Sequence, residues 1–315
     1  MEKRRLGQTD IEIAPLVFGC NIAGWTADQA TSFAIFDAYL DAGFTALDTA
    51  DVYSRWVPSN DSESERIIGR WMKERRNRDK VHVFTKVGSD MGQGKTDLSA
   101  AWIVKAVEDS LTRLQTDYID LYQSHWPDLT VQQDETLEAY DRLLKAGKVR
   151  WIGCSNYDEG LLSEAMRLHD EKGLPRYETL QNEYNLLTRH KYEGAVKDIV
   201  TSKGLSLIPY YSLSAGFLTG KYRTPEDAAK SPRGASIIQR FLNEKGLRVL
   251  AAMDEVAEET GATHAEIALA WVSAQEGVVG PLASASRVSQ VAELVRGARL
   301  KLSTEALAKL TAAGL

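Results

Sequence analysis

The chain has 315 residues, 43% of them hydrophobic and 26% charged, which is ordinary for a globular protein and fits one α/β barrel. The formal net charge of −6 argues against a nucleic-acid or anionic-membrane partner, because both bind basic surfaces. Two cysteines, Cys20 and Cys154, form neither a disulfide framework nor a metal site, and no apolar run approaches the roughly 18 residues of a membrane span.

The first ten residues, MEKRRLGQTD, carry charges without the apolar segment that a signal peptide needs. Together with the low cysteine count, this favours a cytoplasmic location. Residues 3–13 are predicted to form a small hairpin, with a turn between Gly7 and Asp10 and alternation at Ile11 and Ile13. We expect this hairpin to cap the bottom of the fold that follows.

Short apolar runs alternate with longer helical patterns along the rest of the chain. The eight predicted strands are 14–19, 44–48, 81–86, 118–125, 149–155, 177–183, 205–211 and 277–283. The helices that follow them are predicted over 33–43, 62–76, 99–114, 135–148, 158–172, 190–203, 241–260 and 287–296. Two further helices are predicted, at 262–277 before the eighth strand and at 303–315 near the end.

Eight alternating strand and helix units predict an α/β fold, a (β/α)8 TIM barrel with an N-terminal β-hairpin cap, in which residues 1–315 form a single domain. An open doubly wound sheet is the alternative. Residues 19–25, GCNIAGW, do not match the G-x-G-x-x-G loop that such a sheet usually carries after its first strand. Residues 88–97, GSDMGQGKTD, contain Gly-Lys-Thr, but a P-loop needs glycine where Ser89 stands. We interpret this stretch as a flexible loop over the barrel mouth.

In a barrel of this kind, the chemistry lies at the carboxyl ends of the strands. Asp48 ends the second predicted strand, and Tyr53 follows it by five residues. Lys86 ends the third strand and His125 the fourth. Each residue has a structural alternative, because aspartate is common in turns, lysine is often solvated, and histidine and tyrosine often only pack. All four at neighbouring strand ends favour a functional site.

These four side chains have the properties of a proton-transfer unit. A free phenol has a pKa of about 10 and is a poor acid at neutral pH, but a nearby ammonium group lowers that pKa. Asp48 would keep Lys86 charged, and His125 would donate a hydrogen bond to an oxygen atom close to the Tyr53 hydroxyl. Such a site polarises a carbonyl and protonates the developing alkoxide. Without a Ser-His pair or a metal cluster, a nicotinamide is the expected electron source.

Several motifs resemble those of the aldo-keto reductase superfamily, and together they span nearly the whole chain. They are GFTALDTADVY (43–53), DYIDLYQSHWPD (117–128), GKVRWIGCSNY (147–157), LQNEYN (180–185) and IPYYSLSAGFLTGKY (208–222). The resemblance implies an NADP(H)-dependent oxidoreductase that reduces aldehydes or ketones to alcohols. It also implies a catalytic tetrad of Asp48, Tyr53, Lys86 and His125, with Tyr53 as the general acid.

The resemblance further implies a binding site for the cofactor at the later strands. Ser155, Asn156 and Gln181 would hold the nicotinamide carboxamide, and Tyr210 would stack on its ring. Leu213 and Gly216 would pass close to the pyrophosphate. The remaining implied cofactor contacts lie after the eighth strand, at Ser284, Ser286, Arg287 and Gln290.

Two segments depart from the pattern that the superfamily often shows. The loop SRWVPSND (54–61) lengthens the connection between Tyr53 and the Ser-Glu pair at 64–65. After the eighth strand, residues 281–294 keep an arginine at Arg287, but Leu294 stands where the superfamily often has asparagine. Hydroxyl and amide groups beside Arg287 still suit a 2′-phosphate, so NADP(H) is the expected cofactor.

Two other functions are open to a chain with these motifs. A cofactor-binding regulatory subunit that gates a membrane partner would keep the same tetrad and turn over little. The absence of a basic docking tail argues against it. An aldolase barrel would use Lys86 to form a Schiff base, but this reading does not explain Tyr53.

Three tryptophans lie in loops expected to rim the barrel mouth: Trp25, Trp56 and Trp126. They predict an aromatic-walled pocket for a bulky or ring-bearing carbonyl substrate. The alternative is that the three rings pack against one another and only rigidify the loops.

Overall fold

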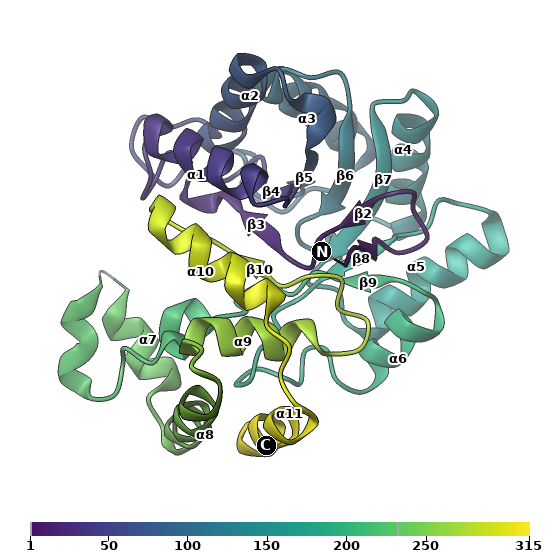
Figure 1. The fold of residues 1–315 in the computed structure, drawn as a ribbon. Coiled ribbons are helices and arrows are strands. Elements are labelled where there is room, and N and C mark those ends of the chain that lie inside the picture. The colour runs from purple at the N-terminus through teal and green to yellow at the C-terminus, as the bar shows by residue number, and fades with distance from the viewer. Residues whose placement is uncertain (1, 232) are drawn as a thin grey trace.

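The computed structural model describes residues 2–231 and 233–315, and its main sheet consists of eight parallel strands ringed by helices (Figure 1). The strands are β3 (Val17–Gly19), β4 (Ala46–Asp48), β5 (His82–Val87), β6 (Ile119–Ser124), β7 (Val149–Ser155), β8 (Thr179–Gln181), β9 (Ser206–Leu207) and β10 (Leu282–Ala283). Their order in the sheet is β10-β3-β4-β5-β6-β7-β8-β9. Backbone bonds from Leu207 to Gly277 and from Leu282 to Pro209 join the two ends, so the sheet closes as a (β/α)8 barrel.

Helices follow the strands in chain order and cover the outside of the barrel (Figure 1). They are α1 (Gln29–Asp41), α2 (Glu63–Arg75), α3 (Ala100–Leu114), α4 (Gln133–Lys145), α5 (Glu159–Lys172), α6 (Ala195–Ser202), α7 (Gly234–Phe241), α8 (Glu244–Thr260), α9 (His264–Ser273), α10 (Val288–Arg299) and α11 (Thr304–Ala313). Side-chain caps begin several of them. For example, Thr263 and Glu266 form a reciprocal capping box at the start of α9.

The N-terminal hairpin, β1 (Arg4–Arg5) paired with β2 (Glu12–Ile13), confirms the predicted cap. Its turn donates backbone hydrogen bonds from Gly7 to the Ser206 hydroxyl and from Gln8 to the Glu178 carboxylate. Both acceptors lie at the amino ends of strands, so the hairpin closes the end of the barrel opposite the site. Its apolar residues pack with the barrel interior in one buried cluster of Leu6, Ile11, Ile13, Val17, Ala46, Phe84, Leu121, Ile208 and Val279.

All eight predicted strands are confirmed, and two helix predictions need correction. The helix predicted over 241–260 begins only at Glu244, because the Asn243 side chain caps α8 by accepting from the Gly246 amide, and the separate helix α7, which ends at Phe241, was not predicted. The helix predicted from residue 190 begins only at Ala195, because the preceding Gly194 has a φ of 88°.

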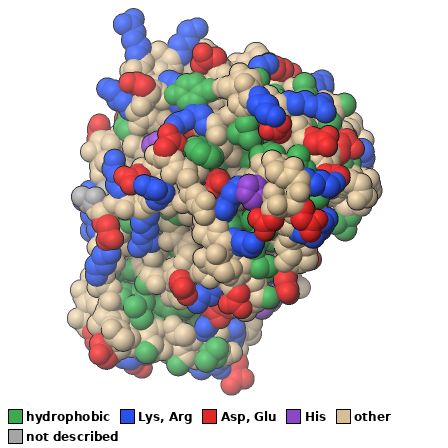
Figure 2. Space-filling view, turned by 90° about the vertical axis from the view of Figure 1, so that its right-hand side faces the viewer, with side chains coloured by type: hydrophobic (Ala, Val, Ile, Leu, Met, Phe, Trp, Pro, Cys, Tyr) green, Lys and Arg blue, Asp and Glu red, His purple; other side chains and the backbone are tan. Residues whose placement is uncertain are grey.

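The outer surface mixes charges of both signs. Figure 2 shows acidic and basic side chains interspersed on the face that it presents. Surface ion pairs include Arg167 with Glu164 and Lys203 with Asp170. Within residues 2–231 and 233–315, no helix has the length and apolar character needed to cross a membrane.

Candidate active site

The carboxyl ends of β4 and β5 bring Asp48 and Lys86 together, as the sequence predicts. Asp48 pairs with Phe84 in the ladder, so Lys86 lies two residues further along the neighbouring strand and on the same face of the sheet as Phe84. Both side chains are fully buried, and the Lys86 ammonium donates to both Asp48 oxygens, to Oδ2 at 2.7 Å. Burial raises the pKa of Asp48, and the Lys86 charge opposes that rise. Since each charge has its partner, the pair is ionised.

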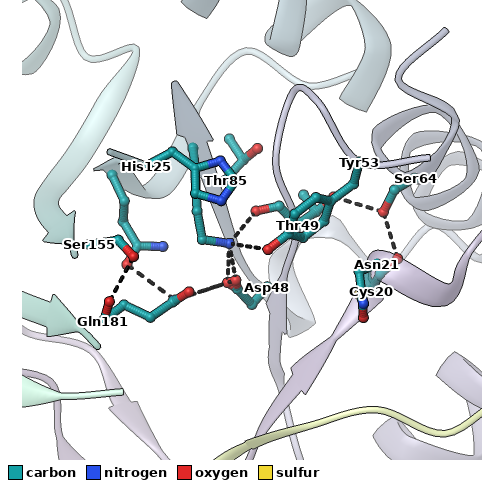
Figure 3. A network of polar contacts seen from close by, with 12 residues as sticks. Cys20, Asn21, Asp48, Thr49, Tyr53, Ser64, Thr85, His125, Ser155 and Gln181 are labelled. Carbon is teal, nitrogen blue, oxygen red and sulfur yellow. Dashed lines mark hydrogen bonds and ion pairs between the residues drawn. The ribbon is translucent and has the colours of Figure 1, made fainter. Parts of the chain in front are cut away.

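The remaining donors of Lys86 fix its position in the site. The ammonium also donates to the Thr49 carbonyl oxygen at 2.7 Å and to the Tyr53 hydroxyl at 3.3 Å. Asp48 in turn accepts from the Gln181 amide at 3.1 Å, which ties the pair to β8. In Figure 3, Gln181 lies on one side of Asp48 and Tyr53 on the other. Burial raises the pKa of Tyr53, while the adjacent Lys86 charge lowers it.

His125 completes the group at the end of β6. Its ring centroid lies 5.7 Å from that of Tyr53, and the two planes are nearly perpendicular. Burial and then the Lys86 charge hold the pKa of His125 well below its usual value, so the ring is neutral at pH 7. Ring atom Nδ1 lies 2.9 Å from the Ser89 hydroxyl. When that hydroxyl donates to Nδ1, the single ring proton is on Nε2 and is available to an oxygen in the site.

The predicted carboxamide-binding residues lie next to this group, at the ends of β7 and β8. Ser155 donates to the Gln181 carbonyl at 2.7 Å. The Asn156 amide donates to the His125 carbonyl at 3.0 Å, and its oxygen accepts from the Tyr210 hydroxyl at 2.7 Å. Asn156 has a left-handed backbone with φ of 62°, which aims its side chain back across the strand ends.

The loop after β9 has an unusual backbone. Ser214, Ala215 and Gly216 take φ values of 48°, 56° and 98° in succession, within the 3-10 segment η3 (Ser214–Thr219). Non-glycine residues in this region are strained, and such strain concentrates at ligand sites. The Ser214 hydroxyl is also buried without a hydrogen-bond partner in the described part of the chain. A strained turn with a free buried hydroxyl fits a ligand that has polar oxygens, such as a dinucleotide pyrophosphate.

The residues predicted after the eighth strand lie at the start of α10. Ser284 donates to the Asn21 side chain at 3.0 Å, which joins this segment to the loop after β3. Gln290 accepts from the Ser286 backbone amide at 2.9 Å. Arg287 is the N-cap residue of α10 and is exposed.

Two of the three tryptophans predicted at the rim contact rings of the tetrad, and the third contacts one of those two. Trp56 lies edge-on to Tyr53, with ring centroids 6.2 Å apart, and contacts Trp25 at 5.5 Å. Trp126 stacks on His125 at 5.9 Å. All three rings are between 39% and 48% exposed, so contact with one another does not bury them. The described residues contain no group of three or more His, Cys, Asp or Glu side chains placed to hold a metal ion.

Sequence reasoning missed two contacts of the site. The Thr49 carbonyl is a backbone group, and no side-chain pattern reveals it. Ser89 is a loop residue that the sequence brings up only as a failed P-loop position, although its hydroxyl contacts His125. Its role depends on how the loop of 88–97 folds over the strand ends.

Known proteins resemble this chain over nearly its whole length. The sequence profile of the Aldo/keto reductase family matches residues 15–314. "Uncharacterized oxidoreductase YrpG" of Bacillus subtilis is 34% identical, over 98% of this chain and 95% of its own length. A rice protein named "Probable voltage-gated potassium channel subunit beta" is 30% identical, over 93% and 90%. "L-glyceraldehyde 3-phosphate reductase" of Escherichia coli O157:H7 is 29% identical, over 98% and 91%. With its barrel, its strand-end residues and a family match over almost its entire length, the chain belongs to the aldo/keto reductase family.

Proposed function

We propose that the protein is an NADP(H)-dependent carbonyl reductase in which Tyr53 is the general acid. The observation that carries this proposal is the contact between the Lys86 ammonium and the Tyr53 hydroxyl, beside a neutral His125. Tyr53 donates its proton to the carbonyl oxygen, and the Lys86 charge stabilises the phenolate that this leaves. His125 orients the same oxygen by a hydrogen bond. A nicotinamide held beside the tetrad would supply the hydride for the carbonyl carbon.

The proposed cofactor site extends from the tetrad to α10. Ser155, Asn156 and Gln181 would hold the carboxamide, Tyr210 would face the ring, and the turn at Leu213–Gly216 would approach the pyrophosphate. The partnerless Ser214 hydroxyl supports this placement. Ser284, Ser286, Arg287 and Gln290 would surround the adenosine phosphate. Two buried free cysteines agree with the proposed cytoplasmic location.

The proposal predicts that Arg287→Ala weakens binding of NADPH by about tenfold or more and leaves binding of NADH nearly unchanged. A charge-assisted hydrogen bond contributes about 1.5–3 kcal/mol, and only NADPH carries the 2′-phosphate that would accept it. Fluorescence titration with both cofactors measures the effect. Arg299→Ala is the control, because Arg299 lies at the other end of α10 and donates to the Ala42 carbonyl. Equal affinity of the wild type for the two cofactors would overturn the NADPH preference.

The exposed tryptophans support a bulky or aromatic substrate. We expect kcat/KM for an aromatic or polycyclic carbonyl to exceed that for glyceraldehyde by at least about tenfold, or about 1.4 kcal/mol. Trp56→Ala or Trp126→Ala should remove most of this preference and leave glyceraldehyde turnover nearly intact, because an apolar wall contacts only the larger substrate.

The control for these variants is Trp102→Ala, since Trp102 lies on α3 outside the predicted rim. The relative named for reduction of glyceraldehyde 3-phosphate makes the small phosphorylated aldehyde a necessary member of the substrate panel. A wild type that prefers glyceraldehyde or its phosphate, or variants with an unchanged ratio, would show that these tryptophans are structural.

The second candidate function is a cofactor-binding regulatory subunit with little turnover. The relative named as a potassium channel subunit supports considering it. The same tetrad would be present in either case, so the site residues alone do not separate the two. Turnover of a generic aromatic aldehyde with NADPH by the purified protein tests the proposed function. Cofactor binding without turnover would favour the regulatory role.

A further inference from the structure

A second buried polar cluster lies directly behind the tetrad, between β4–β6 and the helices α2 and α3. Its centre is Asp51, in the turn that joins Asp48 to Tyr53. The Asp51 amide bonds to the Lys86 carbonyl at 3.3 Å, so this turn runs beside β5. Asp51 is 1% exposed, and neither of its carboxyl oxygens has a hydrogen-bond partner among the described residues.

The donors around Asp51 are already engaged by another carboxylate. Glu65 of α2 accepts from the Thr85 hydroxyl and from Arg113 of α3, both at 2.6 Å. Lys86, on the inner side, is paired with Asp48. Two carboxylates therefore match the two nearby cations, and Asp51 is a third carboxyl without a counter-charge. A buried, unpaired carboxylate is so unfavourable that the group takes up a proton instead.

The other groups around the cluster do not supply the missing charge. Tyr122 of β6 and Tyr140 of α4 are buried phenols with raised pKa values, and the Tyr122 hydroxyl also lacks a partner in the described chain. Burial, and then the Glu65 charge, raise the pKa of Asp51 to about 8, although Arg113, the Val52 backbone amide and Lys86 oppose the rise. In the described structure, the absence of a counter-charge around Asp51 and the direction of its pKa shift thus both indicate that its carboxyl group is protonated.

We propose that Asp51 is a positioning residue that is kept neutral in the folded protein, and that its ionisation opposes the loss of the Tyr53 proton. The inference rests on the proposed role of Tyr53 as the proton donor. An anion at Asp51 would add a further negative charge close enough to interact with Lys86, and it would weaken the stabilisation that the Lys86 charge gives to the Tyr53 phenolate. A neutral Asp51 leaves that charge to Asp48 and Tyr53.

Infrared spectroscopy tests the protonation of Asp51 directly. The difference spectrum between wild type and Asp51→Asn at pH 6 should contain the carbonyl stretch of one protonated carboxyl group, which should fade with a midpoint near pH 8. If the variant does not fold, the pH titration of this infrared band in the wild type alone tests the same point. Absence of this band at pH 6 would overturn the proposal.

Tyrosinate absorbance tests the link to Tyr53. The difference between a protein and its Tyr53→Phe variant reports Tyr53 alone. In the Asp51→Asn background, the midpoint of this titration should lie lower by about one pH unit, because a neighbouring negative charge is no longer formed at alkaline pH. Asp198→Asn, an exposed aspartate on α6, is the matched control and should leave the midpoint unchanged.

An unchanged midpoint in Asp51→Asn would contradict the positioning role. Neither readout needs turnover, so the two proposals can fail separately. A protein that shows both results but reduces no carbonyl would contradict only the proposed function. An active protein without the infrared band would contradict only the role of Asp51.

Thermal unfolding at several pH values is an independent test of the protonation of Asp51, because the proposal predicts the direction in which Tm changes with pH. The folded protein holds the Asp51 proton up to about pH 8, whereas the unfolded chain loses it near 3.8. Folding therefore takes up a proton between these values, and this contribution lowers stability as pH rises. Asp51→Asn has no such group, so its Tm relative to wild type should rise from pH 4 to pH 8. A constant difference across this range would contradict a neutral Asp51.

Discussion

Tyr53→Phe should lower the rate of carbonyl reduction by at least about 10²–10⁴-fold while affinity for the cofactor changes little. The substitution keeps the ring, and with it the edge-on contacts to His125 and Trp56, and removes only the hydroxyl that Lys86 contacts. Steady-state kinetics with an aromatic aldehyde, together with cofactor titration, measures both quantities.

The matched control for this substitution is Tyr192→Phe. The Tyr192 hydroxyl donates to the Glu276 carbonyl at 2.7 Å, next to the segment that enters β10 at its amino end. Its loss should affect stability and leave turnover nearly unchanged. A Tyr53→Phe enzyme within threefold of the wild-type rate would show that another group donates the proton.

Lys86→Met should abolish most activity and also destabilise the fold by about 3–5 kcal/mol, because it leaves the fully buried Asp48 without its cation. An aldolase-type role for Lys86 predicts loss of activity too, but it predicts a covalent adduct in the wild type. Borohydride trapping with a carbonyl substrate should therefore label no lysine in this protein. Chemical denaturation measures the stability change.

Lys203→Met is the control for the loss of a paired lysine. Lys203 pairs with Asp170 on the surface, where an ion pair contributes only about 0–1 kcal/mol. Adding Asp48→Asn to Lys86→Met should restore part of the stability and none of the activity, because it removes the unpaired charge. Normal activity and a normal Tm in Lys86→Met would contradict the electrostatic role.

Much of the fold was predictable from local pattern. Each strand of the barrel is a short apolar run bounded by turns, and each long helix has an apolar face and end signals. Helix α7 escaped this reasoning because its eight residues are short and bury few side chains, among them Ile237 and Phe241. The exact start of α8 depends on the Asn243 cap, and a single asparagine within a polar stretch does not identify a cap from the sequence alone.

The candidate site was predictable where residue type and strand end coincide. Asp48, Lys86 and His125 could be placed in this way, because parallel strands bring their carboxyl ends to one edge. The contact of Ser89 and the unpaired carboxyl group of Asp51 could not, since they depend on how a loop folds and on which donors neighbouring groups already occupy. A charge balance of this kind becomes visible only when Glu65 and Arg113 are seen together.

The measurement that tests carbonyl reduction most directly follows deuterium from the cofactor into the product. The purified protein is mixed with NADPH that carries two deuterium atoms at C4 of the nicotinamide and with an aromatic aldehyde. We predict one deuterium on the carbinol carbon of each alcohol formed, one NADPH consumed per alcohol, and at least a roughly hundredfold slower reaction with Tyr53→Phe. Bound NADPH without labelled alcohol would contradict carbonyl reduction and favour a regulatory, cofactor-binding role.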